Sequence, residues 1–265
     1  MGKALSRMTM LTGTRSSVGK AAPSGTLPAI ALLGAGLAVS LAGTPVAGLR
    51  GAPASLALAL YVGIAATVVE AAKRQGLHRF GAANGVTLLR AAMVAFLAAF
   101  TLLPAPLTAE LRGTAVALGI AGLLLDGVDG WLARRAGTAS RFGARFDMEI
   151  DALSVLVFTL LLLRADQVGV WVLAIGLARY IFVGVGWLSP PLARELPTSL
   201  RRRTICVAVM AALLVALAPF VDAAPASMLC AGALVLLFSS FAMDCVWLLT
   251  LRRTTPPDDP KSAPA

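Results

Sequence analysis

Eight apolar runs of about 17–25 residues divide this chain, and each is long enough to cross the hydrocarbon core of a bilayer as a helix. They lie at 27–45, 53–72, 86–104, 113–133, 147–164, 168–188, 204–221 and 226–250. The first run follows basic residues, as a signal peptide would, but it starts later in the chain than a signal peptide usually does, so we expect a retained helix. The pattern predicts an all-α, polytopic membrane helix bundle of eight helices, or of seven if the first run is cleaved.

The composition supports the membrane assignment. Apolar residues make up 58% of the 265 residues and charged residues only 14%, whereas a water-soluble domain has about 25% charged residues. Disorder and a disulfide-stapled scaffold are excluded by the high apolar content and by the presence of only three cysteines. The net charge of +10 suits cytoplasmic loops and an anionic membrane surface better than nucleic acid, so we expect no nucleic-acid partner.

The basic residues alternate between successive connections. Eighteen of the 23 lie in every second segment: 1–26, 73–83, 134–146, 189–203 and 251–265. By the positive-inside rule these segments face the cytoplasm, so we expect a multi-pass plasma-membrane protein with both termini inside. The tails 1–26 and 251–265 are rich in small, polar or charged residues and predict flexible ends.

Acidic residues crowd the cytoplasmic ends of two consecutive spans. Asp126 and Asp129 are three residues apart and Asp147 and Asp151 four apart, so each pair shares one face of its helix. Carboxylates at membrane depth are costly and normally serve a site. If the two helices are neighbours, four carboxylates converge and need a counter-cation. Oxygen ligands without a nearby His or Cys predict Mg²⁺ or Mn²⁺, most simply as a pair of ions.

Glycines and arginines flank these carboxylates. Gly127 and Gly130 interrupt a helix where alanine would be better by about 1 kcal/mol, which makes sense if a ligand approaches the backbone. Gly143 opens the next helix in the same manner. Arginines in and beside the loop supply donors suited to phosphate oxygens: Arg134, Arg135, Arg141 and Arg145. Carboxylates, metal and arginines together predict a site for phosphate transfer.

One motif contains most of these residues. It reads Asp126-x2-Asp129-Gly130-x2-Ala133-Arg134-x8-Gly143-x3-Asp147-x3-Asp151. The segment resembles, at every position and spacing, the motif of the CDP-alcohol phosphotransferase family. Upstream, Asn84, Thr87 and Arg90 resemble the Asn-x2-Thr-x2-Arg element that opens the first core helix of the family. The resemblance implies a six-helix catalytic core at 80–250, preceded by two accessory transmembrane helices within 27–79.

The resemblance also implies roles for individual residues. Asp126, Asp129 and Asp147 would be metal ligands, and Asp151 would complete the set and act as the catalytic base. The pocket for the CDP moiety would be formed by Gly130, Ala133, Arg134 and Gly143, with Asn84 and Thr87 from the upstream element. For Asn84 a second interpretation is equally supported: it could cap the following helix, because asparagine is a favoured N-cap residue.

The remaining charged residues in or near the spans allow more than one interpretation. Glu149 points away from its acidic neighbours on a helix and predicts a surface or interhelix partner, while Asp244 and Glu70 predict ion pairs with neighbouring basic residues. Arg179 lies inside a span, and Arg201-x-Arg203-Thr204 opens the next, where related enzymes often place a basic pair. These arginines either follow the positive-inside rule or, as we hypothesise, bind a phosphate of the acceptor through Arg179 and one of Arg201 or Arg203.

The resemblance implies transfer of a phosphatidyl-type group from a CDP-linked lipid, CDP-diacylglycerol first, to an alcohol with release of CMP, as in phospholipid biosynthesis. An anionic acceptor favours glycerol 3-phosphate or an inositol phosphate over serine or choline, but 147–151 lacks the Asp-Pro start common in glycerophosphate-type enzymes. Relatives commonly form homodimers. The alternatives are a secondary transporter, which predicts internal repeats and broken helices, and a non-catalytic relative.

Overall fold

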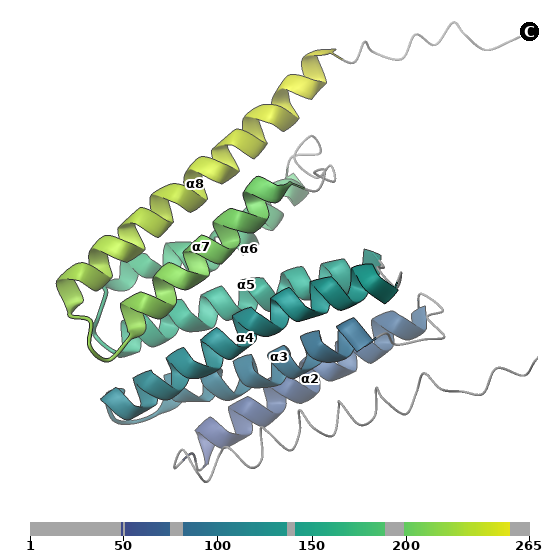
Figure 1. Ribbon diagram of the computed structural model, residues 1–265. Helices are drawn as coiled ribbons and strands as arrows, with labels where there is room; N and C mark the ends of the chain where they lie inside the picture. Colours follow the sequence, from purple (N-terminus) through teal and green to yellow (C-terminus); the bar gives the residue numbers. More distant parts are fainter. Residues whose placement is uncertain (1–48, 50, 75–81, 137–140, 189–198, 255–265) are drawn as a thin grey trace, which may run out of the picture.

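The computed structural model describes residues 49, 51–74, 82–136, 141–188 and 199–254, and the regular elements among them are all helical (Figure 1). The first predicted span, 27–45, lies outside these residues. Two short 3-10 turns accompany seven α-helices. The helices are α2 (Ala52–Arg74), α3 (Ala82–Ala99), α4 (Ala109–Ala136), α5 (Arg141–Arg164), α6 (Leu173–Leu188), α7 (Leu200–Leu217) and α8 (Ala223–Thr254).

Prolines and 3-10 turns shorten three of the predicted spans. α3 ends at Ala99 and continues as the turn Phe100–Leu102, ahead of Pro104. α7 ends at Leu217 because Ala218 precedes Pro219, and a residue before proline avoids the helical region; Ala218 has ψ 140°. α6 begins only at Leu173, after the turn Val170–Val172. An apolar run therefore sets the length of a span but not its helical ends.

The predicted connection 134–146 is largely helical, which corrects the sequence-based boundary. α4 runs on to Ala136 and α5 starts at Arg141, so Arg134 lies in the last turns of one helix and Arg145 in the first turns of the next. A hydropathy boundary marks where apolar residues stop, whereas a helix continues as long as its backbone hydrogen bonds can form, in water or among lipid headgroups.

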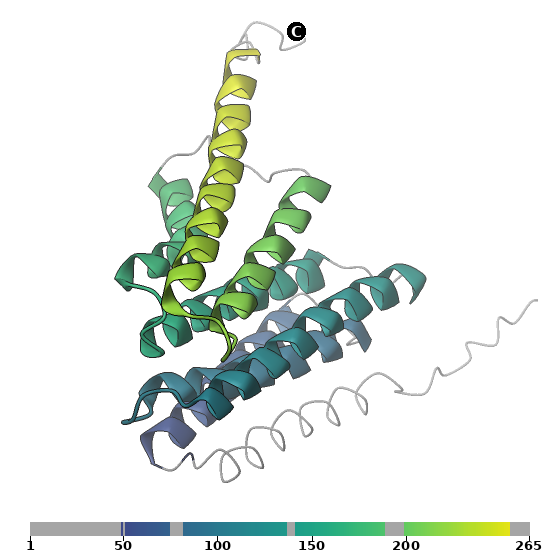
Figure 2. The same ribbon diagram turned by 60° about the vertical axis from the view of Figure 1, so that its left-hand side comes forward.

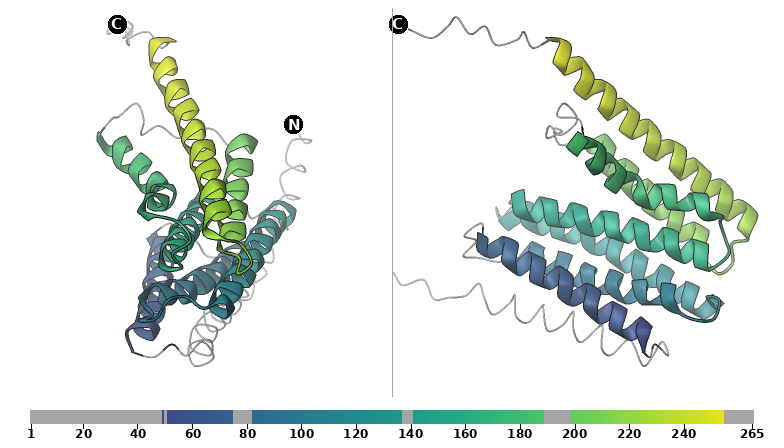
Figure 3. Two further views of the ribbon diagram at one scale, coloured as in Figure 1. Left: turned by 90° about the vertical axis from the view of Figure 1, so that its left-hand side faces the viewer. Right: turned by 180° about the vertical axis from the view of Figure 1, so that it is seen from behind.

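Successive helices from α2 to α8 run in opposite directions. α3, α5 and α7 begin, and α2, α4 and α6 end, on the right-hand side of Figure 1, which we call the site end of the bundle. α5 is central, because it packs on α3, α6 and α7, while α4 packs on α3 and α7. Figures 2 and 3 show α2 to α5 lying side by side and α6, α7 and α8 rising from them as a second group.

The outer surface of the bundle is apolar. Within the described residues, three segments are long and apolar enough to cross a membrane: Ala52–Glu70, Asn84–Leu102 and Ala223–Trp247. Large side chains stand exposed along the first and the third of these segments, with Val62 51%, Met228 76% and Val235 70% accessible, whereas Asn84–Leu102 is mostly buried inside the bundle. The other described helices are shorter or carry charged side chains within their apolar runs. Such a surface is unsuited to water and suited to lipid, so this is an integral, multi-pass membrane protein.

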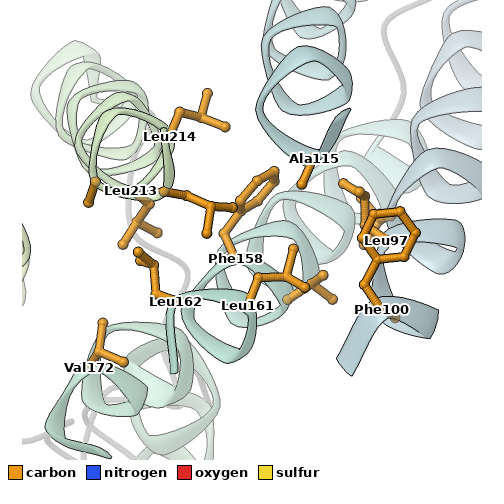
Figure 4. Close-up of a cluster of buried hydrophobic side chains, with 14 of the residues drawn as sticks. Leu97, Phe100, Ala115, Phe158, Leu161, Leu162, Val172, Leu213 and Leu214 are labelled. Atoms are coloured by element: carbon orange, nitrogen blue, oxygen red, sulfur yellow. The ribbon is translucent and has the colours of Figure 1, made fainter. Parts of the chain in front are cut away.

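The main hydrophobic core lies where α3, α4, α5 and α7 meet (Figure 4). Phe158 of α5 is buried among Ala115, Leu161 and Leu214. α4 comes close to it at Gly119, where a Cβ atom would lie 2.5 Å from the Phe158 ring and closer still to Leu214 Cδ2. Small residues on α3 have the same effect, because they let neighbouring helices approach: Ala91, Ala92, Ala95, Ala98 and Ala99 are all buried.

Candidate active site

Three of the predicted aspartates converge at the site end. Asp126 comes from α4, and Asp147 and Asp151 come from one face of α5. One carboxylate oxygen from each lies within 4.8 Å of the others. We call these three residues the aspartate cluster. Asp129 lies three residues beyond Asp126 in the same helix, but its side chain falls outside the described part of the structure.

The side chains of the cluster are only partly buried. Asp126 is the most enclosed, with 14% of its side chain exposed, whereas Asp147 keeps 33% and Asp151 keeps 38%. The two α5 carboxylates therefore stand on the open side of the cluster. A ligand that reaches the cluster meets Asp151 and Asp147 before it meets Asp126.

Arg90 occupies the centre of the cluster. Its Nη1 donates to Oδ1 of Asp147 at 2.6 Å and to Oδ1 of Asp126 at 3.2 Å, and its Nη2 donates to Oδ1 of Asp151. Only 6% of its side chain is exposed. A buried guanidinium is stable only with such partners. α3 therefore contributes to the site as much as α4 and α5 do.

The sequence contained a signal for Arg90 that the motif reading did not use. Arg90 belongs to the element Asn84-x2-Thr87-x2-Arg90, yet no role in the site was assigned to it. An arginine inside an apolar run faces the bundle interior and needs an anion. The aspartates predicted to share helix faces on α4 and α5 are the anions that Arg90 contacts. α3 packs on both α4 and α5, so Arg90 reaches carboxylates of both helices.

The aspartate cluster offers several carboxylate oxygens to a cation. Among the described ion pairs its three carboxylates face Arg90 and, at 3.9 Å from Asp126 Oδ2, Arg203. The cluster can hold a metal ion. Carboxylate oxygens are the ligands of hard divalent cations such as Mg²⁺ and Mn²⁺. The donor set present thus fits the metal that the sequence predicts.

Besides Arg90, four described arginines near the site end form ion pairs, three with carboxylates outside the aspartate cluster and one with the cluster itself. Arg179 pairs with Glu149 across α5 and α6 and contacts Met148 Sδ at 2.9 Å. This contact confirms an interhelix partner for Glu149. Arg201 pairs with Asp244 at 2.5 Å and Arg202 approaches it at 3.7 Å, which confirms the ion pair expected for Asp244. Arg203, the next residue of α7, pairs with the aspartate cluster instead.

The predicted nucleotide-binding residues follow the same helices. Thr87 is buried one turn before Arg90, and Gly143 is half-buried in the first turn of α5. Asn84 is the third residue of α3, so it lies inside the helix and does not occupy the N-cap position. Gly130, Ala133 and Arg134 belong to the last turns of α4, and their side-chain surroundings lie outside the described structure. Their contacts with a nucleotide stay predictions.

These observations define a class of protein: an all-helical, multi-pass membrane protein with an acidic, arginine-bridged site at one end of its bundle. The family model for CDP-alcohol phosphatidyltransferase matches residues 80–248. The chain belongs to this family and is therefore a transferase of phosphorus-containing groups that uses a CDP-alcohol donor and an alcohol acceptor. Searches of curated proteins and of solved structures found no match.

Proposed function

We propose that this enzyme transfers a phosphatidyl-type group from a CDP-linked lipid, CDP-diacylglycerol in the first place, to the hydroxyl of an alcohol and releases CMP. The observation that carries the proposal is the convergence of Asp126, Asp147 and Asp151 around Arg90 at one end of the bundle. There a lipid tail can stay in the bilayer while a nucleotide stays in water. The positive-inside rule supports a cytoplasmic location for this end, because its connections carry most of the basic residues.

The aspartates would hold the metal. Asp126, Asp129, Asp147 and Asp151 are the ligands that we propose for two Mg²⁺ or Mn²⁺ ions. When bound, these ions polarise the diphosphate of the donor and neutralise the charge that develops on the leaving CMP. Arg90 keeps the three described carboxylates together, since without a counter-charge their mutual repulsion would spread them apart.

Asp151 is the residue that we propose as the base. Its Oδ1 accepts a hydrogen bond from Arg90, and Oδ2 takes the proton of the acceptor hydroxyl. The acceptor oxygen then forms a bond to the phosphorus of the phosphatidyl group, and the bond from that phosphorus to CMP breaks with its electron pair on CMP. Asp151 suits this role because it is the most exposed member of the cluster.

The remaining assignments concern substrates and boundaries. Asn84, Thr87, Gly130, Ala133, Arg134 and Gly143 form the nucleotide pocket in this proposal, within a core at 80–250. Arg179 with Arg203 or Arg201 binds a phosphate of the acceptor, which favours glycerol 3-phosphate or an inositol phosphate. Arg203 is supported best, because Arg179 and Arg201 already have carboxylate partners outside the cluster.

Release of CMP tests the proposal directly. Purified protein in nanodiscs receives radiolabelled CDP-diacylglycerol, Mg²⁺ and, separately, glycerol 3-phosphate, an inositol phosphate, serine or choline. We expect release with one acceptor, abolished by chelation, and a loss of about 10²–10⁴-fold in Asp151→Asn, as for removal of a general base.

Asp166→Asn is the matched control. It makes the same chemical change just beyond the far end of α5, at an exposed residue with φ 52° that asparagine also tolerates. It should behave as the wild type. No release with any acceptor would refute the proposal and favour a non-catalytic relative, while acceptor uptake into sealed vesicles without release of CMP would favour a transporter.

A further inference from the structure

Three consecutive arginines, Arg201, Arg202 and Arg203, open α7 and form what we call the arginine triplet. On an α-helix successive side chains are about 100° apart, so these three cannot face one neighbour together. α7 packs against α8 on one side and against α4 and α5 on the other. The direction that each arginine takes therefore decides whether its charge serves the site.

Asp244 of α8 forms ion pairs with the first two members of the arginine triplet. Its Oδ1 accepts from Arg201 at 2.5 Å, and its Oδ2 lies 3.7 Å from Arg202. Its side chain is only 8% exposed, although it lies within an apolar segment, Ala223–Trp247. A carboxylate at such a place is costly without cationic partners.

Arg203 points the other way. The direction midway between Arg201 and Arg202 faces Asp244, and Arg203 stands about 150° from it around the axis of α7. That rotation carries its guanidinium to the α4 side, where Nη2 lies 3.9 Å from Asp126 Oδ2. Its side chain stays 51% exposed, so it remains accessible to a ligand.

We propose that Asp244 is a positioning residue, which fixes the rotation of the start of α7 through Arg201 and Arg202 and so presents Arg203 to a phosphate group bound at the aspartate cluster. This inference rests on the proposed function for its ligand. The phosphate belongs either to the CDP-linked donor or to an anionic acceptor. Asp244 itself touches neither substrate, and acts only through the arginines.

A double-mutant cycle between Asp244 and Arg203 tests this mechanism. Asp244→Asn and Arg203→Gln should each weaken binding of the same phosphate substrate by about tenfold, as expected when a charged hydrogen bond is lost, with kcat within about twofold. The double variant should be no worse than Arg203→Gln alone, because the two residues act through one contact. Asp244→Glu keeps the charge and should restore most of the affinity.

Two separate measurements identify the source of the phosphate. The Kd for CDP with Mg²⁺, from calorimetry, reports on the donor and needs no turnover, whereas the KM for glycerol 3-phosphate reports on the acceptor. Absence of CMP release in the wild type would reject the proposed function. The double-mutant cycle measured on the Kd for CDP would still test the positioning role of Asp244. Asp222→Asn, just before α8 at its other end, is the control and should bind as the wild type does.

Stability separates positioning from a purely structural role. If Asp244→Asn does not fold, Arg201→Gln/Asp244→Asn, which exchanges the ion pair for two amides, replaces it in the cycle. Additive effects of Asp244 and Arg203, or unchanged Kd and KM in a destabilised Asp244 variant, would overturn the inference. An equal loss of kcat/KM for both substrates would overturn it as well, because Arg203 contacts one phosphate.

Discussion

Gly119 offers a way to move the aspartate cluster without touching it. This residue faces Phe158 of α5 and Leu214 of α7, and a Cβ atom added there would lie 2.5 Å from the Phe158 ring and closer still to Leu214. Carbon atoms in contact normally stay about 3.5–4.0 Å apart. Gly119→Ala therefore requires α4 to move outward by roughly 1 Å, or Phe158 and Leu214 to leave their positions in the core.

The cost of this change follows from two opposing terms. Overpacking a well-packed core costs about 1–3 kcal/mol. Alanine in place of glycine within a helix returns up to about 1 kcal/mol. We expect a net loss of about 1–2 kcal/mol in the free energy of unfolding.

The larger effect should be on catalysis, because of where Gly119 lies. Asp126 follows it by seven residues on α4, and Phe158 follows Asp151 by seven residues on α5. Seven residues are two helical turns, or about 10 Å, so each aspartate stands on the same face as its core residue. The helices run in opposite directions, so the Phe158 ring of α5 meets α4 at Gly119 two turns below the cluster, while both helices pack on α3 and α7. A shift of about 1 Å in Asp126 can lower turnover on the order of 100-fold.

Gly122→Ala is the control, since it lies one turn along the same helix and no atom stands within 4 Å of the position that its Cβ would take. Turnover is measured as CMP release in nanodiscs, and stability as the thermal midpoint of purified protein. We expect Gly119→Ala to lose at least about tenfold in kcat and Gly122→Ala to stay within about twofold. Wild-type turnover and stability in Gly119→Ala would show that α4 and α5 do not set the cluster in this way.

Two further changes probe the charged contacts. Arg90→Gln leaves three carboxylates without their central counter-charge, so we expect a loss of about 3–5 kcal/mol in the free energy of unfolding. Mg²⁺ should raise the thermal midpoint of this variant more than that of the wild type, with Arg90→Lys intermediate. Equal responses to Mg²⁺ would contradict this expectation. Arg112 donates to the carbonyl groups of Leu217, Ala218 and Val221 at the end of α7. Arg112→Ala should cost about 1.5–3 kcal/mol in denaturant unfolding without changing the KM of either substrate, and an altered KM would argue against a purely structural contact.

The sequence was most informative about the carboxylates, since helix geometry follows directly from residue spacing. The i, i+4 relation of Asp147 and Asp151 placed them on one face, and the structure brings Asp126 to them. The family expected from the motif is confirmed by the match over 80–248. The division into accessory helices and core, and the nucleotide contacts, stay predictions.

The partners of the arginines were harder to foresee. The expected acceptor site treated Arg201 and Arg203 as equivalent, because both flank the start of the same helix. Their difference depends on the rotation of α7 between α8 and α4, and on Asp244, which is 43 residues from Arg201 in the sequence. Spacing within one helix cannot reveal which neighbouring helix supplies a partner. For Arg90 the sequence did indicate a need for an anion, since it lies inside an apolar run, but not that its three partners come from two other helices.

Contacts with neighbouring helices also explain two arginines that depart from the positive-inside pattern. Arg112 and Arg164 lie at the end of the bundle opposite the site. Arg112 caps α7, and Arg164 donates to the carbonyl groups of Leu103 and Ala105 after α3. Helix C-termini leave carbonyl groups unpaired and carry partial negative charge, so a guanidinium there has a local reason to be present. Basic residues engaged in this way carry little information about orientation. Without these two residues the alternation of basic segments is sharper, which supports the proposal that the site end faces the cytoplasm.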